Sequence, residues 1–168
     1  KVRVPGIKSF QLTGEALGYI PAPIPFSEAF TAVQTGVVDG VIGSGAEGYY
    51  ASFRDVTKTY IPANTHFEVW YMIISNGSLA ELSDEDQAAL KEQAAAFEAT
   101  RWEVAEADQG KNEQRLVDEL GATVAELTEE ELAAMAAKAR AEIWPAVLED
   151  VGVEWGQAIL DKVAAAGN

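Results

Sequence analysis

The stretch of this 168-residue chain that first suggests chemistry is Gly43 to Gly48, which satisfies the pattern G-x-G-x-x-G. It follows the apolar run Val37 to Ile42, and a turn of this kind between a strand and a helix cradles phosphates in dinucleotide-binding domains. That interpretation also requires an acidic residue about 20 positions further on. Glu68 has about that offset but lies near the start of its own apolar run, and Tyr49 crowds the turn. We favour the alternative, a tight turn whose glycines let the backbone approach a bound ligand.

Other catalytic arrangements are incomplete. Ser44 lacks the glycine two residues earlier that a nucleophile elbow requires, because that position is Ile42. The chain has one histidine, His66, and no cysteine, so a cluster of histidine or cysteine metal ligands is excluded. We interpret His66 as a structural hydrogen-bonding residue. The sequence therefore predicts no catalytic residue, no metal site and no cofactor, and a Rossmann-type nucleotide-dependent enzyme remains the alternative.

Two further residues are candidates for ligand contacts. Arg3 lies between two valines in an apparent strand, so it either extends from an edge into solvent or directs its planar guanidinium at a carboxylate. Its position two residues before Pro5, near the end of the strand, favours a cleft. Trp70 and Tyr71 are adjacent, so in a strand they point to opposite faces, and one of them can face a ligand. We include Trp70 among the candidate contacts, with packing in the core as the alternative.

These residues must be positioned by short strands that alternate with helices in the first 75 residues. Alternation of this kind predicts an α/β fold with a parallel or mixed sheet flanked by helices. The longest apolar run, "HFEVWYMIIS" at 66–75, predicts a central strand that ends at Asn76 to Ser78. The other strands are expected at 1–4, 20–24 and 37–42, and the helices at 9–18, at 27–34 with Ser27 as N-cap, and from about residue 46.

The remainder of the chain is predicted to be mostly helical. Ser83 with the acidic residues after it is an N-terminal capping signal for a helix that extends to about Leu120, with Gly110 as a possible weak point. Residues 122–127 are expected to form a short strand or an extended link. Thr128 and the glutamates after it form a capping box for another helix, which bends or ends near Pro145. A last helix is expected at 154–166.

Composition and charge limit the function classes. Apolar residues make up 48% of the chain and charged residues 23%, which is ordinary globular composition. We therefore expect one domain, residues 1–168. The net charge of −15 argues against a nucleic-acid partner, whose phosphates require a basic surface. Residues 1–60 are balanced in charge, so the acidic excess belongs to the rest of the chain, and the first third can still receive an anion. No apolar signal sequence is present at the N-terminus, so the location cannot be read from one.

Several separated motifs occur in a recognisable order: "KVRVP", a helix that ends in "LG", "PAPIPFSEAFTAVQTGVVDGVIG", "KTYIPANTH", and "LSDEDQAAL" before a long helix. The chain closely resembles the substrate-binding proteins of tripartite ATP-independent periplasmic (TRAP) transporters, of the dicarboxylate-receptor type, over essentially all its residues. The resemblance implies one lobe of a two-lobed periplasmic-binding-protein-like fold, with a mixed sheet flanked by helices and a long helical C-terminal part. It also implies that the first lobe is missing.

The resemblance assigns ligand contacts to particular residues. The arginine that clamps the ligand carboxylate in this family falls on Arg3, and the aromatic residue that packs on the ligand falls on Phe26. The loop after "GVVDG" touches ligand in the family, which places Gly43 and Ser44 at the site. Many relatives carry the polar pair "EN" where this chain has Ile42 and Gly43, so we expect backbone donors or Ser44 to act instead. This departure leaves the identity of the organic acid open.

The function that the resemblance implies is reception of a solute. We expect a monomeric periplasmic lobe with no catalysis of its own, which in the intact receptor binds a small carboxylate and delivers it to the membrane subunits of a TRAP permease. A free-standing α/β interaction module is a further alternative to the nucleotide-dependent enzyme.

Overall fold

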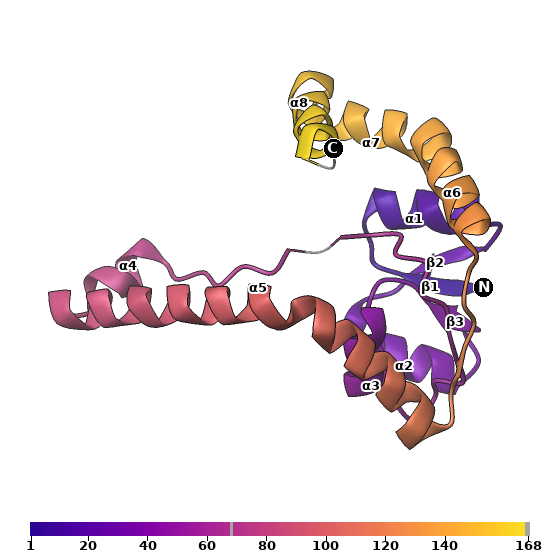
Figure 1. Ribbon diagram of the computed structural model, residues 1–168, viewed down its shortest axis with the longest axis horizontal. Helices are drawn as coiled ribbons and strands as arrows, with labels where there is room; N and C mark the ends of the chain where they lie inside the picture. The colour runs from indigo at the N-terminus through magenta and orange to yellow at the C-terminus, as the bar shows by residue number, and fades with distance from the viewer. Residues whose placement is uncertain (68, 167–168) are drawn as a thin grey trace.

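The computed structural model describes residues 1–67 and 69–166. Its first part is a three-stranded parallel sheet in the order β2-β1-β3, made of β1 (Val2–Val4), β2 (Pro21–Pro23) and β3 (Gly40–Val41). Two prolines are tolerated in β2 because it is an edge strand, where missing backbone donors cost little. Figure 1 shows α1 (Lys8–Ala16) on one side of these strands, and α2 (Phe26–Gln34) with α3 (Gly45–Phe53) on the other.

The three helices follow the strands in sequence, as expected for an α/β fold. The α/β class is thus confirmed, and every strand pairing in the described part of the chain is parallel. The prediction that Ser27 caps the second helix is wrong. The N-cap is Pro25. Its ring holds φ at −53°, close to the helical value, so the helix begins at Phe26, two residues earlier than a Ser27 cap would allow.

The second part is organised by one long helix. α5 (Asp84–Leu120) has 37 residues, begins at Ser83, whose side chain accepts from the Asp86 backbone N–H, and continues through Gly110 without a break. It ends where Gly121 takes a left-handed conformation (φ +65°). The chain then forms β5 (Thr123–Val124), which pairs in parallel with β4 (Thr59–Tyr60). A core cluster joins α3, α5 and these strands: Ala46, Tyr50, Tyr60, Leu116 and Ala122.

The C-terminal helices follow the predicted capping box. Thr128 and Glu131 exchange side-chain and backbone hydrogen bonds at the start of α6 (Glu129–Lys138). A π-helix, η1 (Ala139–Ile143), then leads into α7 (Trp144–Val151) and α8 (Val153–Ala166). The irregularity expected near Pro145 is therefore a π-helical turn just before it. Proline has no backbone N–H, and the π-helical turn adjusts the hydrogen-bonding pattern at this point of the helix. Lys8 forms an ion pair with Asp150 (2.8 Å), which ties α1 to α7.

The central strand predicted at 66–75 is wrong. None of the described residues from 61 to 75 belongs to a strand, and the segment extends away from the sheet to α4 (Asn76–Ala80), where the sequence predicted only a turn (Figure 1). The side chain of Trp70 is 90% exposed. A strand is stable only when another strand satisfies its backbone groups, and the described part of the chain offers no partner here.

We call residues 61–103 the arm, and residues 1–60 together with 104–143 the body. The arm comprises the extended segment, α4 and the first half of α5, and none of its described residues is buried. The body contains all three core clusters. Within the described residues, no helix combines the length and the apolar character needed to cross a membrane.

Candidate functional site

Arg3 is the charged residue that the fold places in its interior. Alternation along β1 directs Val2 and Val4 to the α1 side, where they pack with Phe10, and Arg3 to the side of α2 and α3. The residue is 3% exposed. Its Nε donates to the Ile24 carbonyl oxygen at 2.8 Å, and Cζ lies 5.7 Å from the centroid of the Phe26 ring. The sheet therefore holds this guanidinium against the start of α2.

The two terminal nitrogens of Arg3 are left open. Among the described residues neither has a hydrogen-bond or ion-pair partner, and neither is fully enclosed. Burial lowers the pKa of Arg3, but a guanidinium remains charged in proteins. A positive charge removed from most of its water and lacking an acidic neighbour is costly unless an anion completes it. The geometry suits a carboxylate, which two parallel N–H donors bind in a bidentate manner.

Aromatic side chains of α2 and α3 surround this guanidinium. The Phe26 ring is 53% exposed and meets the edge of Phe53, with ring centroids 5.7 Å apart. Tyr49 packs against Phe53 and Tyr60, and its hydroxyl donates to the Val41 carbonyl oxygen at 2.8 Å. Burial raises the pKa of Tyr49 to about 12, so the phenol stays neutral at physiological pH. Tyr49 thus fixes the end of β3, and the backbone of Gly43 and Ser44 also hydrogen-bonds to its hydroxyl, so it crowds the glycine turn as the sequence predicted.

The glycine turn after β3 adopts left-handed backbone geometry. Gly43 has φ +101° and Gly45 has φ +62°. A Cβ atom on Gly43 would lie 2.8 Å from Cε1 of Phe10, so this position admits no side chain unless Phe10 moves. Phe10 in turn stacks on His66 at 3.7 Å between ring centroids. The space beside Gly43 is therefore filled by an aromatic ring from α1.

Ser44 occupies the N-cap position of α3, but its side chain caps no backbone donor. Its Oγ is buried without a hydrogen-bond partner in the described residues. The backbone N–H of Ala46, in the first turn of α3, hydrogen-bonds to the Tyr60 hydroxyl instead, and a helix N-terminus favours negative charge. An uncompensated hydroxyl such as that of Ser44 is rare in native interiors and requires a physical account.

The remaining predicted residues lie elsewhere. Trp70, in the arm, has no described contact with Arg3 or Phe26, so the structure does not bring it to this cluster. His66 forms a hydrogen bond, as expected of it, since its Nδ1 lies 2.8 Å from the Thr65 hydroxyl, and its ring also stacks on Phe10. Glu68, the acid that a dinucleotide site would require, lies outside the described residues. No group of three or more potential metal ligands is found within the described ranges.

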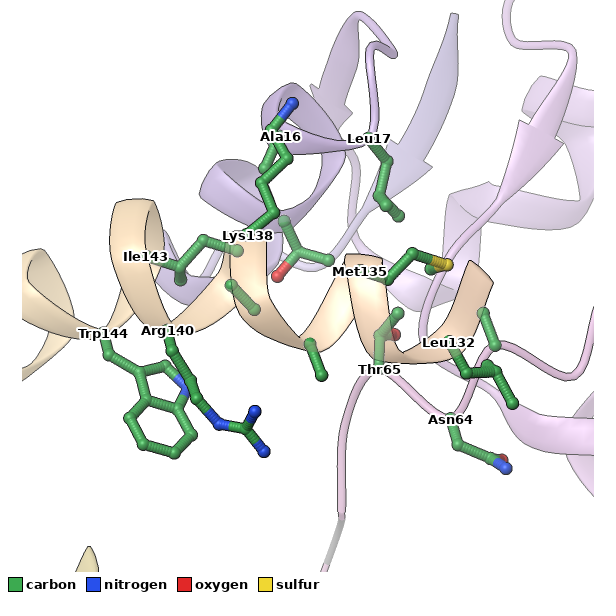
Figure 2. Close-up of a pocket in the computed structure, with 14 residues that line it drawn as sticks. Ala16, Leu17, Asn64, Thr65, Leu132, Met135, Lys138, Arg140, Ile143 and Trp144 are labelled. Atoms are coloured by element: carbon green, nitrogen blue, oxygen red, sulfur yellow. The ribbon is translucent and has the colours of Figure 1, made fainter. Parts of the chain in front are cut away.

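A hollow of about 380 Å³ opens between α1 and the α6–η1 helix (Figure 2). Figure 2 shows Met135 and Leu132 on α6 facing the end of α1 at Leu17, with Thr65 and Asn64 below them. Lys138 and Arg140 are its charged residues, and Arg140 lies over the Trp144 ring at 5.6 Å. None of the residues predicted to touch ligand lines this hollow.

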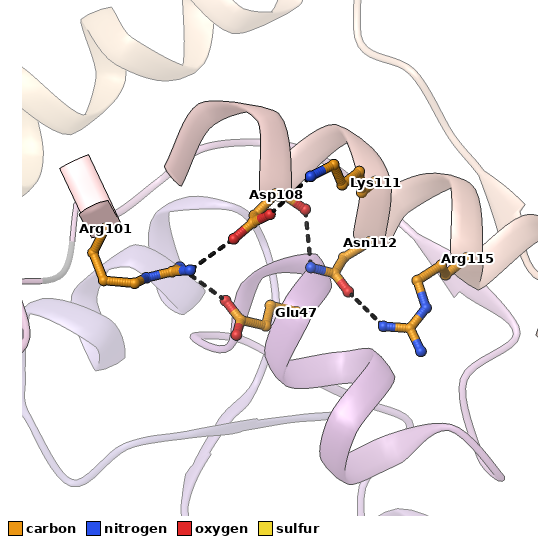
Figure 3. A network of polar contacts seen from close by, with 6 residues as sticks. All are labelled: Glu47, Arg101, Asp108, Lys111, Asn112 and Arg115. Atoms are coloured by element: carbon orange, nitrogen blue, oxygen red, sulfur yellow. Dashed lines mark hydrogen bonds and ion pairs between the residues drawn. The ribbon is translucent and has the colours of Figure 1, made fainter. Parts of the chain in front are cut away.

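A polar network ties α3 to α5 on the outside of the body, beside a second hollow of about 420 Å³ (Figure 3). Arg101 pairs with Asp108 at 2.7 Å and approaches Glu47 of α3 at 3.9 Å. Hydrogen bonds from Arg101 and then Lys111 hold the pKa of Asp108 below its usual value. The network joins the point where α5 enters the body to the first turn of the helix that follows the glycine turn. The charged residues that α5 contributes to this network lie three, four and seven positions apart. This spacing is visible in the sequence, but it did not by itself predict the contact with α3.

The chain matches the family model described as "bacterial extracellular solute-binding protein, family 7" over residues 1–149. It is 38% identical over 96 residues to a solute-binding protein of Roseobacter denitrificans, a match that covers 56% of this chain and 29% of that protein. It is 30% identical over 141 residues to a C4-dicarboxylate-binding periplasmic protein of Shewanella loihica, covering 82% of this chain and 41% of that protein.

Solved structures share the fold at lower identity. A TRAP periplasmic solute-binding protein from Shewanella oneidensis with bound succinate superposes with a TM-score of 0.77 and 23% identity, covering 94% of this chain and 51% of that chain. The chain thus spans about half the length of that structure and less than half of the two relatives.

Proposed function

Because this chain belongs to family 7 of the bacterial extracellular solute-binding proteins, we propose that it is the second lobe of a periplasmic TRAP receptor. In the intact receptor the lobe binds a small organic acid through its carboxylate and presents it to the membrane subunits of the permease. The lobe performs no catalysis. This proposal agrees with the similar proteins named for C4-dicarboxylate binding or crystallised with succinate.

The observation that carries the proposal is the open end of the Arg3 guanidinium. Its Nε is fixed by the Ile24 carbonyl and its face by Phe26, while the terminal nitrogens have no partner among the described residues. Holding an arginine in this way reduces the conformational entropy that a ligand must overcome on binding. A carboxylate supplies the missing charge and accepts two parallel hydrogen bonds.

The turn after β3 and the start of α3 support the same proposal. Ser44 has a buried hydroxyl without a partner among the described residues, and it does not cap α3. The left-handed geometry of Gly43 and Gly45 lets a ligand approach this turn closely. We assign Gly43, Ser44 and Phe26 to the ligand site together with Arg3. Trp70 remains a prediction for the intact receptor, in which the arm meets other parts of the protein.

The arm supports the proposal of a missing first lobe. It presents a set of large exposed apolar side chains, and surfaces of this kind mark places where another part of a protein packs. We infer that residues 1–168 form one domain whose arm completes the core of an upstream lobe. The large exposed apolar residues among the described residues of the arm are Ile61, Phe67, Val69, Trp70, Tyr71, Met72, Ile73, Ile74, Leu82, Leu90, Phe97 and Trp102.

The test is calorimetry on the full-length receptor with a panel of organic acids. An acid that binds the wild type is expected to lose about 2–5 kcal/mol of binding free energy with Arg3→Ala, because its carboxylate is left desolvated and unpaired. Arg3→Lys should also weaken binding, since an ammonium cannot form the paired contact. Arg140→Ala is the matched control, because Arg140 stacks on Trp144 away from this cluster. An unchanged dissociation constant for Arg3→Ala would remove Arg3 from the site.

A further inference from the structure

Among the described residues, Arg3 is the cation that lies against the Phe26 ring. The other basic side chains in the first 60 residues near a helix start or end are engaged elsewhere: Lys8 pairs with Asp150, and Arg54 stacks over Tyr50. The N-terminal amine pairs with Asp39. A ligand with two carboxylates would therefore find a guanidinium for the first and no described cation for the second.

The helices that begin at the site carry acidic side chains in their first turns. Glu28 follows Phe26 on α2, and Glu47 follows the glycine turn on α3. Both are exposed, and Glu47 is only weakly engaged by Arg101, at 3.9 Å. These carboxylates favour the helix N-termini but repel a second negative charge on a ligand.

The surface beside the guanidinium is apolar. Phe26 exposes about half of its ring, and its neighbours Phe53 and Tyr49 are aromatic. No side chain can project from position 43 to hydrogen-bond a second polar group, because φ is +101° and Phe10 occupies the space 2.8 Å from the missing Cβ. The backbone of Gly43 and Ser44 hydrogen-bonds to the Tyr49 hydroxyl, so these amides add no free donor for a second polar group.

We propose that the ligand is a monocarboxylate with an apolar body, which packs on Phe26 while Arg3 holds its carboxylate. The inference rests on the proposed function and narrows it, because it sets this receptor apart from relatives that are named for C4-dicarboxylates. Desolvating a second carboxylate against Phe26 without a cation disfavours dicarboxylates. Burying the exposed part of the Phe26 ring favours an apolar body.

The test compares butanoate with succinate on the full-length receptor by titration calorimetry. These acids share a four-carbon chain and differ in whether a methyl group or a carboxylate ends it. Butanoate is expected to bind at least about tenfold more tightly than succinate, and phenylacetate more tightly still. Phe26→Ala should weaken phenylacetate about tenfold and acetate much less, since acetate has almost no body to pack.

The control variant is Tyr19→Ala, which removes another exposed aromatic ring, between α1 and β2, and should leave all four affinities unchanged. A preference for succinate over butanoate that is lost in Arg3→Ala would overturn the monocarboxylate inference and leave the receptor function standing. Equal weakening of phenylacetate and acetate by Phe26→Ala would also overturn it. If none of the four acids binds the wild type, the result would count against the proposed function itself.

Discussion

The body and the arm are both rich in large apolar side chains, yet only the body buries them. Val4 and Leu116 are fully enclosed in the body, whereas Trp70, Tyr71 and Phe97 of the arm lie in the open. The two regions share one continuous helix, α5, whose second half packs on α3 and whose first half has no described neighbour of that kind (Figure 1). Apolar composition therefore creates the demand for burial, but a core forms only where the chain supplies a second surface.

The largest expected effect separates the two halves of α5 directly. Leu116→Ala should lower the free energy of unfolding of this chain by about 2–5 kcal/mol, because it opens a cavity in the cluster around Tyr50 and Tyr60. Leu90→Ala makes the same change on the exposed half of the helix and should cost less than about 0.5 kcal/mol. Urea unfolding followed by circular dichroism measures both. Similar losses for the two variants would show that the arm is as well packed as the body.

A smaller effect on stability is expected at two glycines of the body, Gly43 and Gly110. Gly43→Ala should cost about 1–3 kcal/mol, since alanine is strained at positive φ and its Cβ meets the Phe10 ring. Gly110 lies in α5 near the point where the arm joins the body, and it has open space around it. Gly110→Ala should therefore raise the free energy of unfolding by up to about 1 kcal/mol. Differential scanning calorimetry should therefore show a lower Tm than the wild type for Gly43→Ala and a higher Tm for Gly110→Ala. A stabilising Gly43→Ala would mean that the turn is not held as described.

The smallest effect concerns the pH dependence of the body. Hydrogen bonds from Tyr50 and then Arg115 lower the pKa of Glu119 in the folded chain. Its contribution to stability is therefore present above the ordinary glutamate pKa of about 4.3 and is lost as the pH falls through the lower folded value.

Glu119→Gln should consequently flatten the loss of stability in that acidic range, and Tyr50→Phe should act in the same direction. Thermal unfolding between neutral pH and about pH 3 measures the change. An acid limb with the same slope in wild type and Glu119→Gln would show that this interaction does not contribute.

The sequence predicted the elements whose signals are local. The capping box at Thr128, the N-cap at Ser83 and the alternating strands and helices of the first 60 residues all form. These signals act through backbone geometry and nearest neighbours, which do not depend on the rest of the protein. The strand at 66–75 depended instead on partner strands, and its apolar pattern alone carried no information on whether they were present.

The candidate site divides in the same way. Arg3 could be predicted because a charged residue between valines in a strand is conspicuous in the sequence. The crowding of the turn by Tyr49 was predicted, but its hydrogen bond to the Val41 carbonyl was not, because that contact depends on how α3 packs against the sheet. The contact between Phe10 and the space beside Gly43 could not be predicted. Phe10 lies in α1 and Gly43 follows β3, and the two residues meet only when the helix packs on the sheet.

The contact between Gly43 and Phe10 also constrains how the glycine turn can change over evolutionary time. Any larger residue at position 43 first requires a smaller one at position 10, and that step removes a buried ring from the cluster with Val2 and Val4. A smaller residue at position 10 would relieve that contact, but the left-handed backbone would still strain any residue with a Cβ atom at position 43. Homologues that share this turn geometry are therefore expected to keep glycine at position 43 even where position 10 varies.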